Sequence, residues 1–193
     1  MPRLALALPL APLLVAPLLV ALLVVAPLLV VPARAELAEA PPTGSFAFSF
    51  AVELPGPPVE MYDALTGDIS GWWDHTMSDD PVALEIQARP GGHFLETFDA
   101  SGDGVVHATV TYAKRGEKLR MVGPLGLAGH AVHMVTTYEL EALDGDRSRL
   151  TVSVHASGEV HPGWDEIVLA TWHHFIDDRF VPWVTAGKHR EKP

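Results

Sequence analysis

The sequence contains no cysteine among its 193 residues. This absence excludes disulfide bonds, a cysteine nucleophile, thiolate metal ligands and a lipid-modified cysteine. A fold without disulfides is stabilised by its hydrophobic core alone, and the roughly 158 residues beyond position 35 are enough for one such core. A single domain is therefore expected.

Positive charge is also scarce. Setting aside Arg3 and Arg34, which lie in the first 35 residues, 11 of the 13 Lys and Arg remain against 24 Asp and Glu, a formal net charge of −13. Nucleic-acid binding needs a cationic surface that displaces counterions from phosphates. We therefore expect no nucleic-acid partner, and the adjacent Trp72 and Trp73 are poor candidates for base-stacking platforms.

Sequence motifs of catalysis are missing as well. There is no Gly-x-Ser-x-Gly elbow, no phosphate-binding loop and no Gly-x-Gly-x-x-Gly after a strand. None of the ten histidines has a recognised metal-ligand spacing, so no metal site and no cofactor are predicted. Two groups are candidates for acid–base chemistry, although exposed charged loops explain them more simply. They are Asp74, His75, Asp79 and Asp80 in "DHTMSDD", and His155 with Glu159.

A long uncharged stretch occupies the N-terminus. Residues 4–31 follow Arg3 and lead into "PARA", whose Ala33 and Ala35 fit the small-x-small rule of signal peptidase. We predict a signal peptide over residues 1–35, cleaved after Ala35, and a periplasmic or secreted protein without a stable membrane span. Because the stretch is longer than an ordinary signal core of roughly 7–15 residues, the alternative is an N-terminal membrane anchor.

The remainder divides into a flexible leader over residues 36–44, a domain over 45–187 and a tail over 188–193. The segment "SFAFSFAVEL" alternates Phe46, Phe48, Phe50 and Val52 with smaller residues, the period of a half-buried strand.

Helical spacing then predicts two short helices, one led by prolines and a second carrying Ile69, Trp72 and Trp73. Adjacent helical side chains point about 100° apart, so one indole is expected to pack in the core and the other to meet a pocket rim.

Six antiparallel strands follow, separated by turn residues, and residues 161–187 then change to a helical period. Apolar side chains recur there every three or four residues from Trp164 to Trp183, with Pro162 at the start and Gly187 at the end. Pro182 is expected to kink or end the last turns. Such a helix must pack against the sheet.

Strict alternation assigns the faces of the strands. On "GVVHATVTY" it places Val106, Ala108, Val110 and Tyr112 inside and His107 outside. It likewise places His133 and His155 on polar faces. All three histidines are therefore expected to face solvent.

Three segments give the chain a family likeness: "LPGPPVEMYDALTGDISGWW", "ARPGGHFLE" and "TYELEALDGDRSRLTVSVHASG". With them, the chain from about Ser45 to Gly187 resembles the SRPBCC superfamily, also called START or Bet v 1-like, especially the branch of the C-terminal domain of the Hsp90 ATPase activator. The resemblance implies an α+β helix-grip fold, in which a curved antiparallel β-sheet wraps around a long C-terminal α-helix, with two short helices after the first strand. An export signal departs from the cytosolic members.

The resemblance also implies a largely apolar cavity, in which members bind lipids, sterols, hormones or polyketides and a minority catalyse cyclisation or dehydration. We predict an exported carrier, scavenger or sensor of a small hydrophobic or amphipathic molecule, rather than an enzyme. The alternatives are a cavity enzyme of polyketide cyclase or dehydratase type, favoured by a His or carboxylate projecting inside, and a protein-interaction module with a filled core. The predicted ligand contacts are Trp72, Trp73, Phe94, Tyr112, Met134, Tyr138, Trp172 and Phe175.

Overall fold

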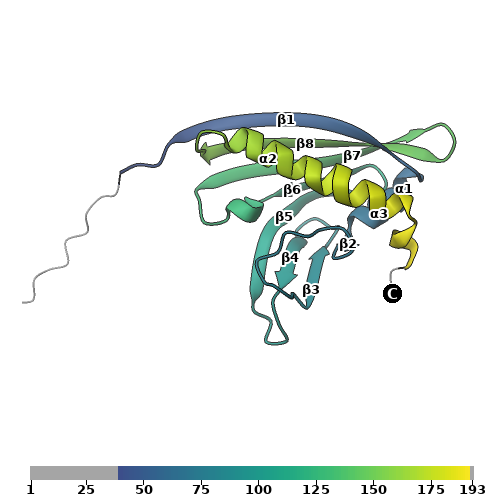
Figure 1. Cartoon of the computed structure of the whole chain (residues 1–193), viewed down its shortest axis with the longest axis horizontal. Coiled ribbons are helices and arrows are strands. Elements are labelled where there is room, and N and C mark those ends of the chain that lie inside the picture. The colour runs from purple at the N-terminus through teal and green to yellow at the C-terminus, as the bar shows by residue number, and fades with distance from the viewer. Residues whose placement is uncertain (1–38, 192–193) are drawn as a thin grey trace, which may run out of the picture. The chain divides into compact units, whose positions relative to one another are not determined.

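The structure is a computed structural model that describes residues 39–191, so the predicted signal peptide lies outside the described residues. One antiparallel sheet of eight strands, in the order β1-β8-β7-β6-β5-β4-β3-β2, curves around a long C-terminal helix (Figure 1). This is the predicted α+β architecture. The strands are β1 (Thr43–Leu54), β2 (Gly67–Asp68), β3 (Ala83–Ile86), β4 (His93–Thr97), β5 (Gly104–Lys114), β6 (Lys118–Val122), β7 (Val132–Leu143) and β8 (Arg147–Glu159).

β1 forms one edge of the sheet, and its side chains alternate between half-buried and exposed positions. Phe46, Phe48 and Phe50 are half-buried, as their period of two predicted. Phe50 stacks on His173 of the C-terminal helix, with ring centroids 4.2 Å apart. The strand begins at Thr43 rather than at the predicted Ser45, because its pairing with β8 extends two residues further.

The C-terminal helix consists of three consecutive parts: α2 (Trp164–His173), the π-helical segment η2 (His174–Phe180) and α3 (Val181–Thr185). Its buried stripe includes Trp172, Phe175, Phe180 and Trp183, as predicted. The change of helix type precedes Pro182, and the helical path continues through it. Beyond the helix, the short turn η3 (Lys188–Glu191) brings His189 to Glu60 of α1 (Pro58–Leu65), with a hydrogen bond of 2.7 Å.

The predicted second short helix is wrong. After α1 the chain forms the two-residue strand β2, which pairs with β3, and Ile69 N–H then donates to Leu84 O at 3.0 Å. Because the sheet takes these backbone groups, only one turn remains, in which the N–H groups of Trp72 and Trp73 both donate to Ile69 O. The tryptophan pair is therefore held by a turn anchored to the sheet.

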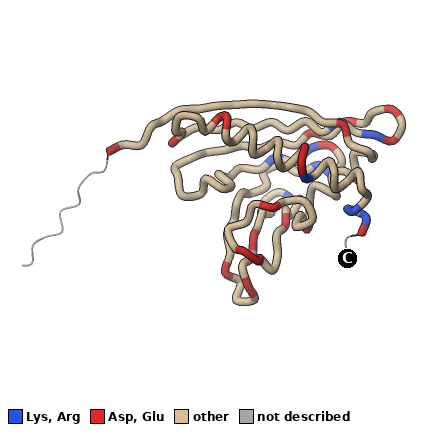
Figure 2. Tube along the Cα trace, viewed as in Figure 1, with Lys and Arg blue, Asp and Glu red and all other residues tan. Residues whose placement is uncertain are grey.

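The core lies between the helix and the sheet, and charged residues lie around it. Figure 2 shows acidic residues along many elements, whereas the end of the sheet where β7 begins and β8 ends has no Lys or Arg. The sequence agrees, since neither Lys nor Arg occurs in 121–146 or 150–178. Within residues 39–191, no helix has the length and apolar character needed to cross a membrane.

Candidate functional site

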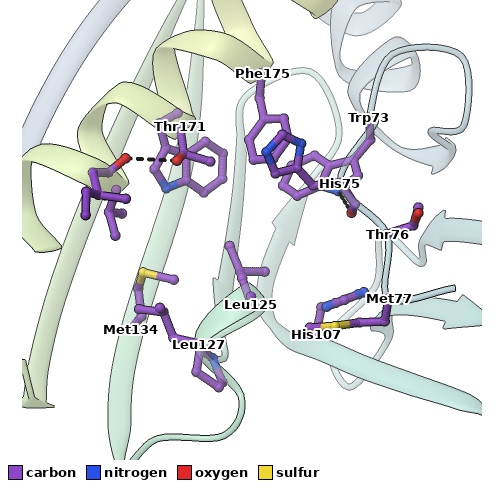
Figure 3. A pocket seen from close by; sticks show the side chains of 15 residues that line it. Trp73, His75, Thr76, Met77, His107, Leu125, Leu127, Met134, Thr171 and Phe175 are labelled. Atoms are coloured by element: carbon purple, nitrogen blue, oxygen red, sulfur yellow. Dashed lines mark hydrogen bonds between the residues drawn. The ribbon is translucent and has the colours of Figure 1, made fainter. Parts of the chain in front are cut away.

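A cavity of about 330 Å³ lies beneath the C-terminal helix (Figure 3). Its volume falls at the lower end of the range of small-molecule sites, roughly 300–1,000 Å³. The walls come from the chain after the tryptophan pair, from β5 and β7, from the turn before β7, and from α2 and η2. The lining residues are Trp73, His75, Thr76, Met77, His107, Pro124, Leu125, Gly126, Leu127, Met134, Ile167, Val168, Thr171, Trp172 and Phe175.

Four predicted contact residues, Trp73, Met134, Trp172 and Phe175, line this cavity. Trp73 stacks on Phe175 with ring centroids 3.7 Å apart, and Trp172 meets Trp73 edge-on at 6.0 Å. Such aromatic packing fixes the side chains as a rigid wall. The two tryptophans have different positions. Trp73 faces the cavity, whereas Trp72 packs edge-on against Phe180, with ring centroids 5.0 Å apart.

Three further predicted residues, Trp72, Phe94 and Tyr138, are buried next to the lining without belonging to it. Phe94 packs edge-on against Trp73 at 4.9 Å, and Tyr138 against Trp172 at 5.9 Å. The Tyr138 hydroxyl has no hydrogen-bond partner among residues 39–191, and its burial raises the pKa of the phenol.

Tyr112 is a correction, because its side chain is 42% exposed and lies on the outer face of the sheet. The reason is a pair of β-bulges in β5. Phe94 pairs with Ala108 but Leu95 pairs with Val106, and Val110 pairs with Met121 but Tyr112 with Arg120. Each bulge adds one residue to β5, which breaks strict alternation.

The same bulges overturn the prediction that His107 faces solvent. His107 is the extra residue of the first bulge, and both it and Ala108 are buried. Its ring lines the cavity. The predictions for His133 and His155 are confirmed, since both are exposed.

Behind His107 lies a fully buried carboxylate, Glu96 of β4. His107 Nε2 donates to Glu96 Oε2 at 2.9 Å. The backbone N–H groups of Met77 and Ser78 donate to Glu96 Oε1 at 2.8 and 2.7 Å. Burial by itself would raise the pKa of the Glu96 carboxyl, but these three donors outweigh it and hold the pKa below its usual value.

Sequence reasoning missed this pair, although one signal was present. In "HFLETF", Glu96 shares its face with Phe94 and Phe98. A carboxylate on an apolar face needs a buried partner. Because Nε2 donates to Glu96, Nδ1 is the ring nitrogen that remains for a molecule in the cavity.

At the mouth of the cavity, the Asp74 carboxylate contacts the side chains of three residues. It accepts from His75 Nδ1 at 2.9 Å and from His174 Nε2 at 3.0 Å, and Arg179 Nε lies 3.1 Å from its Oδ2. Partial burial would raise the pKa of Asp74, but these contacts lower it overall. Asp79 and Asp80, predicted with them, are exposed and lie outside this cluster.

The mouth also exposes apolar surface. Ile167 of α2 is 62% exposed and Met77 52% exposed, and both line the cavity. The short helix η1 (Leu125–Leu127) also belongs to the lining. Leu125 adopts a left-handed backbone conformation with φ of 52°, which is unusual for a residue other than glycine, while its side chain is buried in the wall.

The predicted pairing of His155 with Glu159 is wrong. Glu159 instead accepts from His130 Nδ1 at 2.6 Å and from His161 Nε2 at 3.1 Å. His155 lies four residues earlier on β8, on the exposed face. The two actual partners come from loops on either side of the strand end, which strand parity alone does not locate.

No family model matches the chain, and no curated protein matches it. Solved structures share its fold. A protein from Chromobacterium violaceum has a TM-score of 0.54 at 22% identity, over 72% of this chain and 96% of its own. A protein of unknown function from Staphylococcus aureus has a TM-score of 0.54 at 11% identity, over 70% and 91% of the two chains. At these identities the likeness shows the fold alone, which is compatible with an SRPBCC-like fold.

Proposed function

We propose that this protein binds a small, largely apolar molecule in the cavity, with a polar group of that molecule next to His107. The observation that carries the proposal is the cavity itself, about 330 Å³ in volume and walled by Trp73, Trp172 and Phe175. A mostly apolar space with a few polar groups is the usual form of a small-molecule site. The cavity also counts against the filled-core alternative.

Filling the cavity tests this proposal. Thr171 lines it from α2, whereas the neighbouring Ala170 is exposed. Because a tryptophan at position 171 takes up space that the molecule needs, Thr171→Trp is expected to raise the dissociation constant of a neutral fluorescent probe, N-phenyl-1-naphthylamine, by at least about tenfold. Ala170→Trp, the matched control, is expected to leave it unchanged. Equal binding by both variants would contradict the proposal.

A second candidate function is an enzyme that transfers protons within the cavity, as in a cyclisation or dehydration. The observation that favours it is the buried Glu96–His107 pair, since a carboxylate that holds one ring nitrogen leaves the other to act as an acid or base. Native mass spectrometry, followed by chromatography of the released molecule, separates the two candidates. A carrier releases the molecule unchanged in mass and in chromatographic retention. An enzyme releases a product that has lost one water, for a dehydration, or that has the same mass but a different retention time, for a cyclisation, and His107→Gln stops that change.

We further propose that the chain is a member of the SRPBCC superfamily, in the branch resembling the C-terminal domain of the Hsp90 ATPase activator. The strand, helix, consecutive antiparallel strands and C-terminal helix support this assignment. The fold of this family encloses a cavity, which suits both a carrier and an enzyme that acts within the cavity.

We also propose export with cleavage after Ala35. The small-x-small pattern at Ala33 and Ala35 supports it. Exported protein is then expected to begin at Glu36, which intact-mass measurement of the periplasmic or secreted fraction checks. A full-length mass retained in the membrane fraction would indicate the alternative, an N-terminal anchor.

A further inference from the structure

Two segments far apart in the sequence converge at the end of the sheet opposite the β7–β8 turn. His130 lies in the loop after η1, Glu159 ends β8, and His161 lies in the turn before α2. The ring nitrogens His130 Nδ1 and His161 Nε2 lie 2.6 and 3.1 Å from the same atom, Glu159 Oε1. One potential ligand atom from each residue lies within 4.8 Å of the others.

The surrounding chain holds these groups in place. Ala131 N–H donates to Glu159 Oε2 at 3.2 Å, and Glu159 N–H donates to Ala131 O at 3.0 Å, so the carboxylate is fixed to the loop that carries His130. Both rings pack against Trp164, with centroids 4.9 Å away for His130 and 4.7 Å for His161. Hydrogen bonds and packing of this kind orient metal ligands in known sites.

The charge of this region favours a cation. Residues 121–146 and 150–178, which include His130, Glu159 and His161, contain no Lys or Arg. Within residues 39–191, the Glu159 carboxylate is the one acidic group that both histidine rings contact, through its Oε1 atom. Each histidine is about two-fifths exposed, which leaves an approach from solvent.

We propose that His130, Glu159 and His161 form a binding site for a divalent transition metal of the Zn²⁺ type. Two imidazoles and one carboxylate are a common ligand set for zinc, and they leave a coordination position open. Imidazole ligands favour such metals over Mg²⁺ and Ca²⁺, which prefer oxygen. The site is separate from the cavity, and its existence does not depend on what the cavity binds.

The other His–carboxylate cluster, at Asp74, His75 and His174, is the natural comparison. Its ligand atoms are equally close together. Arg179 Nε, however, lies 3.1 Å from Asp74 Oδ2. A fixed guanidinium neutralises the carboxylate and repels a second cation, so this cluster serves as the control.

The test is titration of the complete chain, without a histidine tag, with Zn²⁺ by calorimetry and with Co²⁺ by visible absorption. We expect one equivalent of metal and, for Co²⁺, the absorption of a complex with nitrogen ligands. Because even outer-shell changes cost about 10–100-fold in metal affinity, His161→Ala and Glu159→Gln are each expected to weaken binding at least about 100-fold.

Two controls remove a histidine elsewhere: His155→Ala, on the exposed face of β8, and His174→Ala, in the comparison cluster. Both are expected to bind Zn²⁺ as the unaltered chain does. Circular dichroism verifies that each variant is folded. Absence of one-to-one binding, unchanged affinity in folded His161→Ala and Glu159→Gln, or loss confined to His174→Ala would overturn the proposal.

Discussion

Replacing Glu96 by glutamine is expected to lower the free energy of unfolding by about 3 kcal/mol, since each buried group left without its hydrogen-bond partner costs about 1–3 kcal/mol, and more where the lost partner is a carboxylate. The carboxylate accepts hydrogen bonds from His107 Nε2 and from the backbone N–H groups of Met77 and Ser78. A glutamine amide replaces one accepting oxygen with a donor, so at least one buried N–H loses its acceptor. Urea unfolding measures the effect.

The control is Glu117→Gln, whose exposed carboxylate pairs with Lys114. Because exposed ion pairs contribute little, this change is expected to alter stability by less than about 1 kcal/mol. Equal effects of the two substitutions would show that the buried pair does not stabilise the fold.

The pH dependence provides a second test of the same pair. The pKa of Glu96 is lowered in the folded protein, so the folded state binds its proton less readily than the unfolded chain does. The stabilisation is therefore complete above the unfolded value of about 4.3 and is lost as the pH falls from there through the folded pKa. Glu96→Gln is expected to lose stability less steeply below about pH 4.3 than the unaltered chain. Parallel curves would contradict this assignment.

Replacing Trp172 by alanine is expected to lower the free energy of unfolding by about 3–5 kcal/mol and also to weaken probe binding. Trp172 is 2% exposed, contacts Tyr138 and Phe175 through its ring, and lines the cavity. Loss of the indole removes both core packing and one wall of the site. We expect the dissociation constant of N-phenyl-1-naphthylamine to rise about fivefold or more, with the far-ultraviolet circular dichroism little changed.

Trp72→Ala is the matched control, because Trp72 is equally buried but does not line the cavity. The same loss of stability is expected from it, without the loss of probe affinity. If both variants weaken binding equally, the effect comes from general loosening of the core and Trp172 is not a wall of the site.

Much of the fold is predictable from the sequence because it depends on periodic patterns. The alternation around Phe48 predicts β1, and the apolar stripe from Trp172 to Trp183 predicts the helix that packs on the sheet. Helical spacing around Trp72 predicts a second short helix. That helix does not form because β2 pairs with β3, a tertiary contact that leaves no periodic pattern in the sequence.

The site is less predictable, because it depends on departures from periodicity. Met134 and Trp172 follow regular patterns, and both line the cavity. His107 and Tyr112 lie at or beyond β-bulges, where a single added residue reverses inside and outside. The convergence of His130 and His161 on Glu159 depends on two loops, and no spacing within one element predicts it.

The π-helical segment η2 bonds each N–H to a carbonyl five residues back, so it holds one residue more than an α-helix over the same number of turns. Such a segment is the expected trace of a one-residue insertion. Deleting one residue within 176–180 would restore an α-helix over the same number of turns, so the helix after it would keep facing the sheet. Trp172, which precedes the segment, would keep its place. The helix can therefore lose one residue after Phe175 while Trp172 and Phe175 before that point and Trp183 after it keep their positions against the sheet.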